Sequence, residues 1–219
     1  MNITASPDSP GAPVRTETSH AARAPAVVRG AKPALITCRK LGADEHGLHA
    51  AHLRRLSEHD RAMRFMGCVP DAHIDDYCQP REAGRRVVLG HFEAGVLRGV
   101  AEVVFDAWPP WNGGCELAFS VESQWQGRGI GTALMRRAVA LARNRGAAPV
   151  RVLFLRENRR MRALALRLGM QLTIRDGEVE ATLRPPWPNQ LSLLAEALGD
   201  GQACWTRWLT GHTAGTRAA

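Results

Sequence analysis

The sequence predicts an α/β domain, α+β in detail, with about six or seven strands in one central sheet and about four flanking helices. Three observations lead to this prediction. Apolar residues alternate over short runs that suit strands, and they recur every three or four residues over longer runs that suit amphipathic helices. A glycine-rich turn joins one strand directly to the longest helix. In a chain of 219 residues, 45% of them hydrophobic, these elements suit one compact domain with tails.

The first half of the chain is predicted to contain a tail, a strand, three short helices and a hairpin. Residues 1–32 are rich in Pro, Ala, Ser and Thr and lack periodic apolar residues, so we expect a disordered tail. Asp44 is a candidate cap for the first helix, and Gly67 and Pro70 separate the next two. The expected elements are strands at 34–39, 86–92 and 96–105 and helices at 44–56, 58–65 and 71–78.

The second half is predicted to alternate strands with helices. Gly146 is expected to end the long helix after the glycine turn. Asn158 is a candidate cap for the next helix, and Gly169 is a candidate stop. Asp176 and Gly177 predict a hairpin turn. The expected elements are strands at 115–121, 150–155, 170–174 and 179–183 and helices at 129–145, 159–168 and 191–198.

The charge of the chain is basic but dispersed. The formal net charge is +8, and the basic side chains are mostly arginines in scattered pairs. Such pairs are more typical of solvated faces than of a nucleic-acid patch. Nucleic-acid binding is therefore the weakest functional class, and it predicts a steeply salt-dependent affinity.

Nothing in the sequence predicts export, a membrane span or a metal site. The five cysteines are an odd number without paired metal spacing, which fits a reduced, cytoplasmic compartment. The N-terminus lacks a signal-peptide layout, and no apolar run is long enough to span a membrane. His46, His49 and His52 recur every three residues, but a polar helix face is more typical of such a run than a metal site. We expect a soluble cytoplasmic protein without a bound metal.

The glycine turn at 126–131 is the most informative motif. Gly127, Gly129 and Gly131 allow backbone N–H groups to approach a ligand, and the helix behind them presents the positive end of its dipole. The turn is no nucleoside-triphosphatase P-loop, because no Gly-Lys-Ser/Thr follows. Its glycine spacing also departs from the dinucleotide fingerprint. By itself the turn predicts a phosphate cradle.

Two motifs together carry a specific resemblance. The letters Q-G-R-G-I-G at 126–131 match the Q/R-x-x-G-x-G/A motif of the GNAT (GCN5-related) N-acetyltransferases. The segment 155–170 resembles the second signature of that family, an Asn-capped helix that ends in Leu-Gly-Phe, here Leu-Gly-Met. The resemblance implies a GNAT domain at 33–184, with a mixed sheet splayed between the fourth and fifth strands. Residues 185–219 would then form a partly helical C-terminal extension.

The family resemblance implies a binding site for acetyl-CoA. In that family acetyl-CoA lies in the splay, whose walls here are the strands at 115–121 and 150–155. Backbone N–H groups of the glycine turn would hold the pyrophosphate, and Asn158 would lie near the pantetheine and thioester. The resemblance assigns the following residues to the cofactor: Phe119, Ser120, Val121, Gln126, Gly127, Arg128, Gly129, Gly131, Thr132, Asn158 and Met161.

Glu116 is the candidate catalytic residue. An amine must lose a proton before it attacks a thioester, and a carboxylate near the splay can take that proton. Glu116 has apolar neighbours in its strand, so we expect it to be partly desolvated. The alternative is a strand glutamate that faces solvent.

A narrower resemblance concerns the acceptor. The layout looks like the acetyltransferase domain of bacterial protein lysine acetyltransferases, in which a glutamate at the position of Glu116 is the general base. This resemblance implies that the acceptor is a protein lysine. The motifs that carry it are Leu56-Ser57, Arg64-Phe65, Glu116-Leu117-Ala118, and Asn158 followed by Met161.

One position departs from the family pattern. Many members carry a tyrosine in the second-signature helix that reprotonates the departing thiolate, and this chain has Ala165 there. The only tyrosine, Tyr77, is in a different region of the sequence. Water or another group could protonate the thiolate instead, or the thiolate could leave without protonation.

Several alternatives stay open from the sequence. The acceptor could be a small amine, such as a polyamine, an aminoglycoside or an amino acid, and Asp71, Asp75 and Asp76 with Glu116 could form an acidic mouth for it. The chain could also be an acetyl-CoA sensor that has lost turnover. We expect a monomer or homodimer without a membrane partner. In the C-terminal extension, Trp205 and Trp208 are expected to pack on the domain.

Overall fold

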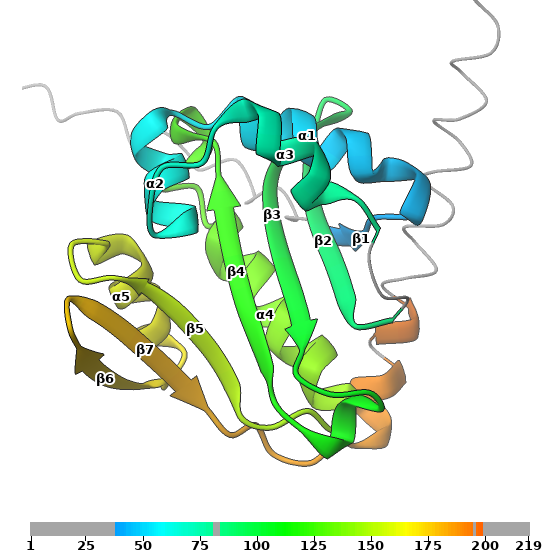
Figure 1. Cartoon of the computed structure of the whole chain (residues 1–219). Helices are drawn as coiled ribbons and strands as arrows, with labels where there is room; N and C mark the ends of the chain where they lie inside the picture. The colour runs from blue at the N-terminus through cyan, green and yellow to red at the C-terminus, as the bar shows by residue number, and fades with distance from the viewer. Residues whose placement is uncertain (1–37, 81–83, 195, 199–219) are drawn as a thin grey trace, which may run out of the picture. The chain divides into compact units, whose positions relative to one another are not determined.

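The computed structural model describes residues 38–80, 84–194 and 196–198, all within one unit of the chain. Seven strands form one sheet in the order β1-β2-β3-β4-β5-β7-β6 (Figure 1). All neighbouring strands are antiparallel except the parallel pair β4–β5. The strands are β1 (Cys38–Lys40), β2 (Arg86–Glu93), β3 (Val96–Phe105), β4 (Cys115–Val121), β5 (Val150–Leu155), β6 (Gln171–Arg175) and β7 (Glu178–Leu183).

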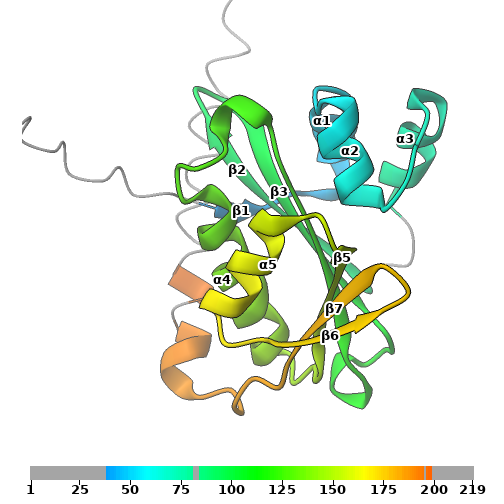
Figure 2. The same ribbon diagram turned by 90° about the vertical axis from the view of Figure 1, so that its left-hand side faces the viewer.

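The helices lie on both sides of this sheet, with α1, α2 and α3 on one side and α4 and α5 on the other (Figure 2). Residues 190–194 and 196–198 are also helical. No helix in the described part of the chain is long and apolar enough to cross a membrane. The helices are α1 (His46–Arg54), α2 (Glu58–Phe65), α3 (Asp71–Cys78), α4 (Ile130–Asn144) and α5 (Arg159–Arg167), with short 3-10 turns η1 (Ala43–Glu45), η2 (Pro110–Asn112) and η3 (Ser123–Trp125).

The main hydrophobic core lies between the sheet and α4. Val103 and Phe105 of β3 and Leu117 of β4 point to this side, because residues two apart in a strand share a face. They pack against Leu134 and Ala138, which lie four residues apart on one face of α4. Burying one such leucine stabilises the fold by roughly 1.5–3 kcal/mol. Burial of these regularly spaced apolar residues therefore holds α4 against β4.

The sheet opens between β4 and β5. These strands pair only at Cys115 with Val150 and at Glu116 with Arg151, whereas β5 pairs with β7 over its whole length. Beyond Glu116 the facing edges of β4 and β5 lack ladder partners in each other. The predicted α/β fold, with its sheet splayed between the fourth and fifth strands, is confirmed.

Local details correct some expectations. Asp44 does not cap the first helix: it lies inside η1, and Glu45 is the N-cap residue of α1. The side chain of Asn158 caps α5 as predicted, since its Oδ1 accepts a hydrogen bond from the N–H of Met161 at 3.0 Å. The expected tail at 1–32, the start of the first strand and the packing of Trp205 and Trp208 lie outside the described residues.

A half-buried carboxylate attaches the C-terminal segment to the domain. Glu196 accepts hydrogen bonds from Lys40 Nζ at 2.9 Å, Asn144 Nδ2 at 2.8 Å and Arg145 Nη1 at 3.0 Å. Burial alone would raise the pKa of Glu196, but these hydrogen bonds and the charge of Lys40 outweigh it and lower the pKa to about 2. This part of the extension is therefore held against α4 and β1.

Candidate functional site

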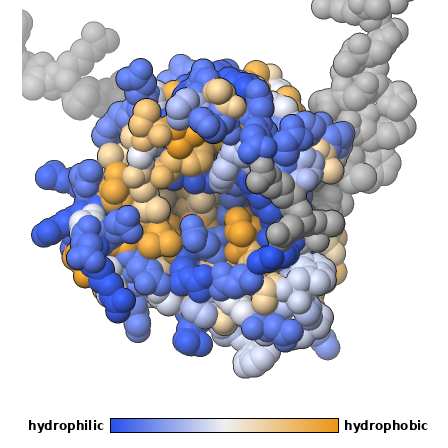
Figure 3. All heavy atoms as spheres, viewed as in Figure 1, coloured by the Kyte–Doolittle hydropathy of each residue, from blue (hydrophilic) through white to orange (hydrophobic). Residues whose placement is uncertain are grey.

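A cavity of about 930 Å³ occupies the opening between β4 and β5. The side chains of β4 alternate between its two sides. Phe119 packs in the core with α4, whereas Ser120 faces α1, where its Oγ lies 2.9 Å from Nε2 of His52. Glu116 and Ala118 share the side of Ser120. The cavity thus joins the two faces of the sheet, and Figure 3 shows a hollow on one face with hydrophobic residues around it and hydrophilic residues at its rim.

The glycine turn borders this cavity at the N-terminus of α4. Gly127 and Gly129 have φ angles of 76° and 85°, which a side chain would strain. Gly129 is the N-cap of α4 and offers no side-chain cap, so the first N–H groups of the helix have no intrahelical partner. Gly131 and Thr132 of this turn line the cavity. The helix terminus is therefore available to an anion.

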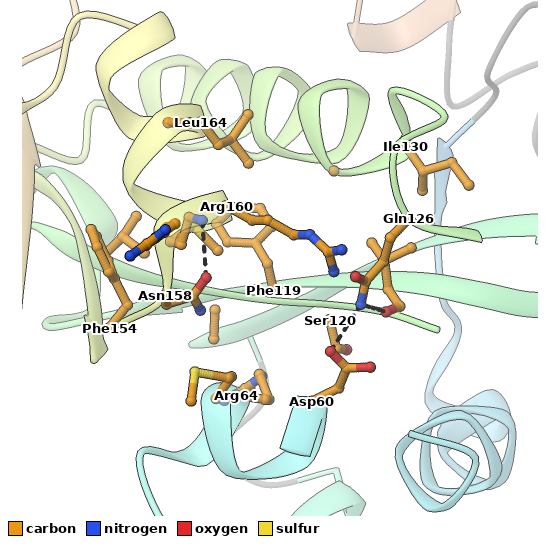
Figure 4. A pocket seen from close by; sticks show the side chains of 18 of the residues that line it. Asp60, Arg64, Phe119, Ser120, Gln126, Ile130, Phe154, Asn158, Arg160 and Leu164 are labelled. Atoms are coloured by element: carbon orange, nitrogen blue, oxygen red, sulfur yellow. Dashed lines mark hydrogen bonds between the residues drawn. The ribbon is translucent and has the colours of Figure 1, made fainter. Parts of the chain in front are cut away.

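Gln126 positions the turn through its side chain. Its Nε2 donates to Asp60 Oδ1 at 3.0 Å and to the carbonyl oxygen of Val121 at 2.9 Å (Figure 4). Asp60 also accepts hydrogen bonds from Ser57 Oγ and Ser123 Oγ, and although burial raises the pKa of Asp60, these bonds lower it overall. Gln126 Oε1 is buried without a partner among the described residues. The turn is thus tied to α2 and keeps one acceptor for a ligand.

Arginines surround the cavity on the α5 side. Arg159, Arg160 and Arg167 line it, and Arg160 extends from α5 into the cavity (Figure 4). Arg128, which the sequence places in the turn, is not among the lining residues; its guanidinium carbon lies 4.5 Å from the ring centroid of Trp125. The lining arginines favour a ligand with several negative charges.

The second predicted cofactor group lies on the same side. Asn158 and Met161 both line the cavity, as do Phe119 and Val121 of β4. Asn158 caps the helix through Oδ1, so its side-chain nitrogen Nδ2 has no role in the cap. Of the predicted cofactor residues, the structure therefore brings all but Arg128 to the cavity.

Glu116 lies at the closed end of the opening. It is half-buried, lines the cavity and pairs in register with Arg151. Arg151 Nη2 donates to Asp106 Oδ1 at 2.7 Å, and this bond is the main cause of the raised pKa of Arg151, with further contributions from the charges of Glu116 and Glu180. Glu116 is thus a partly desolvated carboxylate next to a cation, on the face of α1–α3.

Tyr77 lies in the site, although the sequence suggests a different region. It lines the cavity from α3, while Ala165 is fully buried in the core. The Tyr77 hydroxyl lies 3.0–3.1 Å from both carboxylate oxygens of Glu102 and accepts a hydrogen bond from Arg64 Nη2 at 2.7 Å. Burial and the charge of Glu102 raise the pKa of Tyr77 to about 12. Its hydroxyl is therefore a poor proton donor.

Glu102 is the centre of a buried charge cluster behind this wall. It forms ion pairs with Arg64 and Arg86 and lies 3.4 Å from Nε2 of His49. Burial opposes its ionisation, but the charge of Arg64, followed by His49 and Arg86, holds the pKa of Glu102 well below its usual range. An isolated charge would be costly here. The cluster holds α1, α2 and α3 against β2 and β3.

A second buried chain of hydrogen bonds has the connectivity of a nucleophilic triad. His52 Nε2 lies 2.9 Å from Ser120 Oγ, and His52 Nδ1 lies 3.4 Å from Glu122 Oε1. Burial lowers the pKa of His52 to about 4, so it is a weak base. Glu122 is also engaged by Arg55 at 2.8 Å and Arg98 at 2.7 Å. This chain satisfies buried polar groups under α1 rather than activating Ser120.

The three histidines of the first helix have different partners. His49 faces Glu102, His52 faces Ser120, and His46 Nδ1 lies 3.0 Å from the carbonyl oxygen of Ala43. Within residues 38–80, 84–194 and 196–198, no group of three His, Cys, Asp or Glu side chains could hold a metal ion.

The acidic mouth expected around Asp71, Asp75, Asp76 and Glu116 is wrong for the three aspartates. Asp71 forms an ion pair with Arg61, Asp75 forms one with Arg54, and neither these aspartates nor Asp76 lines the cavity. Asp75 of α3 is paired with an arginine of α1, and Asp71 with an arginine of α2, so both carboxylates are engaged in ion pairs. The carboxylate that faces the cavity near its closed end is Glu116.

Sequence reasoning missed several residues of the site. Asp60, Met63 and Met66 line the cavity from α2 and its C-cap. The spacing of Ser57 and Asp60 marks a helix start, but no local pattern links Asp60 to Gln126, which lies 66 residues later. These residues meet only because α2 packs over β4.

The fold and cavity define a class of protein: a mixed α/β domain whose opened sheet has a cavity bordered by an uncapped helix N-terminus. The chain belongs to the acetyltransferase (GNAT) family, whose model matches residues 50–170, more than half of the chain. No curated protein sequence matches it significantly.

Solved structures share this fold at low sequence identity. The GNAT domain of PAT from S. lividans is 21% identical, with a TM-score of 0.59 over 68% of this chain and 89% of that domain. The putative acetyltransferase yncA from Salmonella typhimurium, solved with acetyl-CoA, is 18% identical, with a TM-score of 0.52 over 71% of this chain and 98% of its own. The ribosomal-protein-S18-alanine N-acetyltransferase from Escherichia coli is 14% identical, with a TM-score of 0.53, covering 70% and 96%.

Proposed function

We propose that this protein transfers the acetyl group of acetyl-CoA to a primary amine, the side chain of a protein lysine, with Glu116 as general base. One observation carries the proposal: a single cavity connects the helix N-terminus at the glycine turn with Glu116, through the opening of the sheet. A cofactor on one face and an acceptor on the other can therefore meet at the carboxylate.

The residues of the cavity fit acetyl-CoA. Its pyrophosphate suits the free N–H groups at Gly129 and Gly131, and its negative charge suits Arg160. One helix terminus supplies only about 0.3–1 kcal/mol, up to about 2 when partly buried, so the pantetheine arm must contribute as well. The edge of β4 beyond Glu116 has backbone groups without partners in β5, and these can bind an extended arm.

The mechanism follows from the position of Glu116. Acetyl-CoA supplies an activated acetyl group as a thioester. Glu116 accepts a proton from the acceptor ammonium, because only the neutral amine has a lone pair to form the new C–N bond. The C–S bond breaks as the C–N bond is completed, and its electron pair leaves with sulfur. The second proton of the attacking nitrogen passes to solvent, which leaves a neutral amide. Arg151 is the residue of β5 paired with Glu116, and its hydrogen bond to Asp106 fixes its side chain.

Departure of the thiolate needs no tyrosine in this proposal. Ala165 carries no hydroxyl, and the raised pKa of Tyr77 makes proton transfer from it unfavourable. A thiol with a pKa near 8.5 is a tolerable leaving group near neutral pH, and solvent can protonate it after release.

Thiol release tests the function. The full chain is incubated with acetyl-CoA and a lysine peptide, a polyamine or no amine, and free thiol is measured with mass spectrometry of the acceptor. We expect lysine-dependent release. Binding of acetyl-CoA without release would establish the sensor alternative, and transfer only to the polyamine would establish a small-molecule acceptor.

Glu116→Gln tests the base. We expect kcat/KM to fall about 100-fold or more near neutral pH, because the amide cannot take the proton. Glu180→Gln is a matched control, since Glu180 also acts on Arg151 but does not line the cavity. Full activity of Glu116→Gln across the pH range would remove Glu116 from the base role.

A further inference from the structure

Met66 ends α2 in a backbone conformation that methionine rarely adopts. Its φ is 56° and its ψ is 25°, in the left-handed region. Its N–H and that of Gly67 both donate to the carbonyl oxygen of Ala62. Helices that end in this way usually place glycine at the left-handed position, and the glycine of this chain is one residue later. A side chain at this position carries a steric cost.

The Met66 side chain does not repay that cost by packing in a core. It is 37% exposed and belongs to neither hydrophobic cluster of the described residues. It lines the cavity instead. His59 and Met63, four residues apart on one face of α2, line the same cavity, and Met66 follows the last residue of this helix. An outlier of this kind at a cavity wall points to a functional role.

The wall that Met66 completes suits an alkyl chain. Met63 and Met66 line the cavity on the side of α1–α3, as does Leu153 of β5. Methionine is flexible and polarizable, and it adapts to the shape of an apolar ligand. The carboxylate of Glu116 lies in the same cavity. An amine at the end of an unbranched apolar stem matches this order of groups.

We propose that Met66 is a specificity-determining residue: its side chain closes the acceptor side of the cavity around the unbranched alkyl stem of the amine. This inference rests on the proposed acetyl transfer. It deepens that function, because it states that one residue selects the length of the alkyl stem of the acceptor. The strained backbone of Met66 is retained because it places the side chain against that stem.

The test compares three forms of the full chain: wild type, Met66→Ala and Met66→Gly. Each is assayed with one peptide that carries either lysine or its shorter homologue ornithine. Free 1,5-diaminopentane is also assayed, because it presents an amine on an unbranched alkyl stem without a peptide. We expect the wild type to prefer lysine by about tenfold in kcat/KM, the usual effect of one methylene in an apolar pocket. Both variants should reduce this preference below about threefold, while the KM for acetyl-CoA changes by less than about twofold.

Thermal unfolding distinguishes the effect of removing the Met66 side chain from the effect of relieving its backbone strain. Because glycine adopts positive φ without strain, Met66→Gly should have a Tm about 2–4 °C above that of Met66→Ala. Ala94→Gly is a matched control: Ala94 has a φ of 49°, in the β2–β3 turn, and does not line the cavity. This variant should gain stability and keep the wild-type preference for lysine.

The outcomes distinguish the two levels of the proposal. If the wild type acetylates lysine peptide but both Met66 variants keep its preference, the role of Met66 is wrong and the transfer stands. If the wild type transfers acetyl to no amine, the proposed function is wrong and this inference falls with it. Equal Tm values for the two Met66 variants would show that the backbone is not strained.

Discussion

Asp60 should control the affinity for acetyl-CoA although it lies on the acceptor side. Its carboxylate joins α2 to the glycine turn through Gln126 Nε2 at 3.0 Å. Replacing Asp60 with Ala removes this acceptor and frees the turn from α2. A hydrogen bond to a charged group contributes roughly 1.5–3 kcal/mol, and the partial exposure of Asp60 favours the lower value.

The structure sets the expected magnitude. If about 1.4 kcal/mol of this bond orders the turn for the ligand, its loss raises the Kd for CoA about tenfold. Gln126→Ala should produce a rise at least as large, because it removes the other partner and also the acceptor Oε1. The double variant should be no weaker than Gln126→Ala alone, since Asp60→Ala removes only the bond that Gln126→Ala has already removed. Isothermal titration calorimetry with CoA measures all four Kd values without requiring turnover.

Ser57→Ala provides the control for this cycle. Ser57 Oγ also bonds Asp60, at 2.9 Å, and accepts from its N–H as the cap of α2, but it does not touch the turn. Loss of the cap should cost about 0.5–2 kcal/mol of stability and leave the Kd for CoA nearly unchanged. Additive effects of Asp60→Ala and Gln126→Ala, or an equal loss of affinity in Ser57→Ala, would refute the coupling.

Two further predictions concern the turn and the C-terminal segment. Gly129→Ala, at a φ of 85°, should lower the Tm and weaken CoA binding, whereas Gly177→Ala, at a φ of 87° in the β6–β7 turn, should lower the Tm only; equal CoA affinities would contradict the cradle. For Glu196, the lowered pKa of about 2 means that its stabilisation is present above the unfolded-state pKa, near 4.3, and is lost as the pH falls toward 2. Glu196→Gln should therefore be less stable than the wild type at pH 6 in urea unfolding, and the difference should vanish near pH 2; a constant difference would show that Glu196 does not titrate in this way.

The buried charge clusters explain how the acceptor wall is held. Glu102 binds Arg64 of α2 and Arg86 of β2, while Glu122 binds Arg55 at the end of α1. A buried carboxylate with several cations resists displacement, because separation would leave charges unpaired. The helices over the cavity are thus positioned by electrostatics, and Met66 can occupy its unfavourable conformation at the end of a fixed helix.

The sequence alone determined those features that depend on a few neighbouring residues. Gly127 and Gly129 are required by local φ angles, and the cap of Asn158 reaches only to Met161. The alternation of apolar residues also assigns the strands and α4, because each element must bury one face. These local rules were enough to predict the α/β fold, and motif resemblance supplied the expected place of the cofactor.

Only the tertiary structure decided which residues share the cavity. Asp60 meets Gln126, Tyr77 reaches the site from α3, and the Arg128 guanidinium stacks on Trp125. The sequence did not show the strain at Met66 either. Gly67 follows it, and glycine is the residue that usually takes the left-handed position at a helix end. The physical reason is that these contacts depend on how α2 and α3 pack over an opened sheet, and that packing couples residues far apart in the chain, which no local propensity encodes.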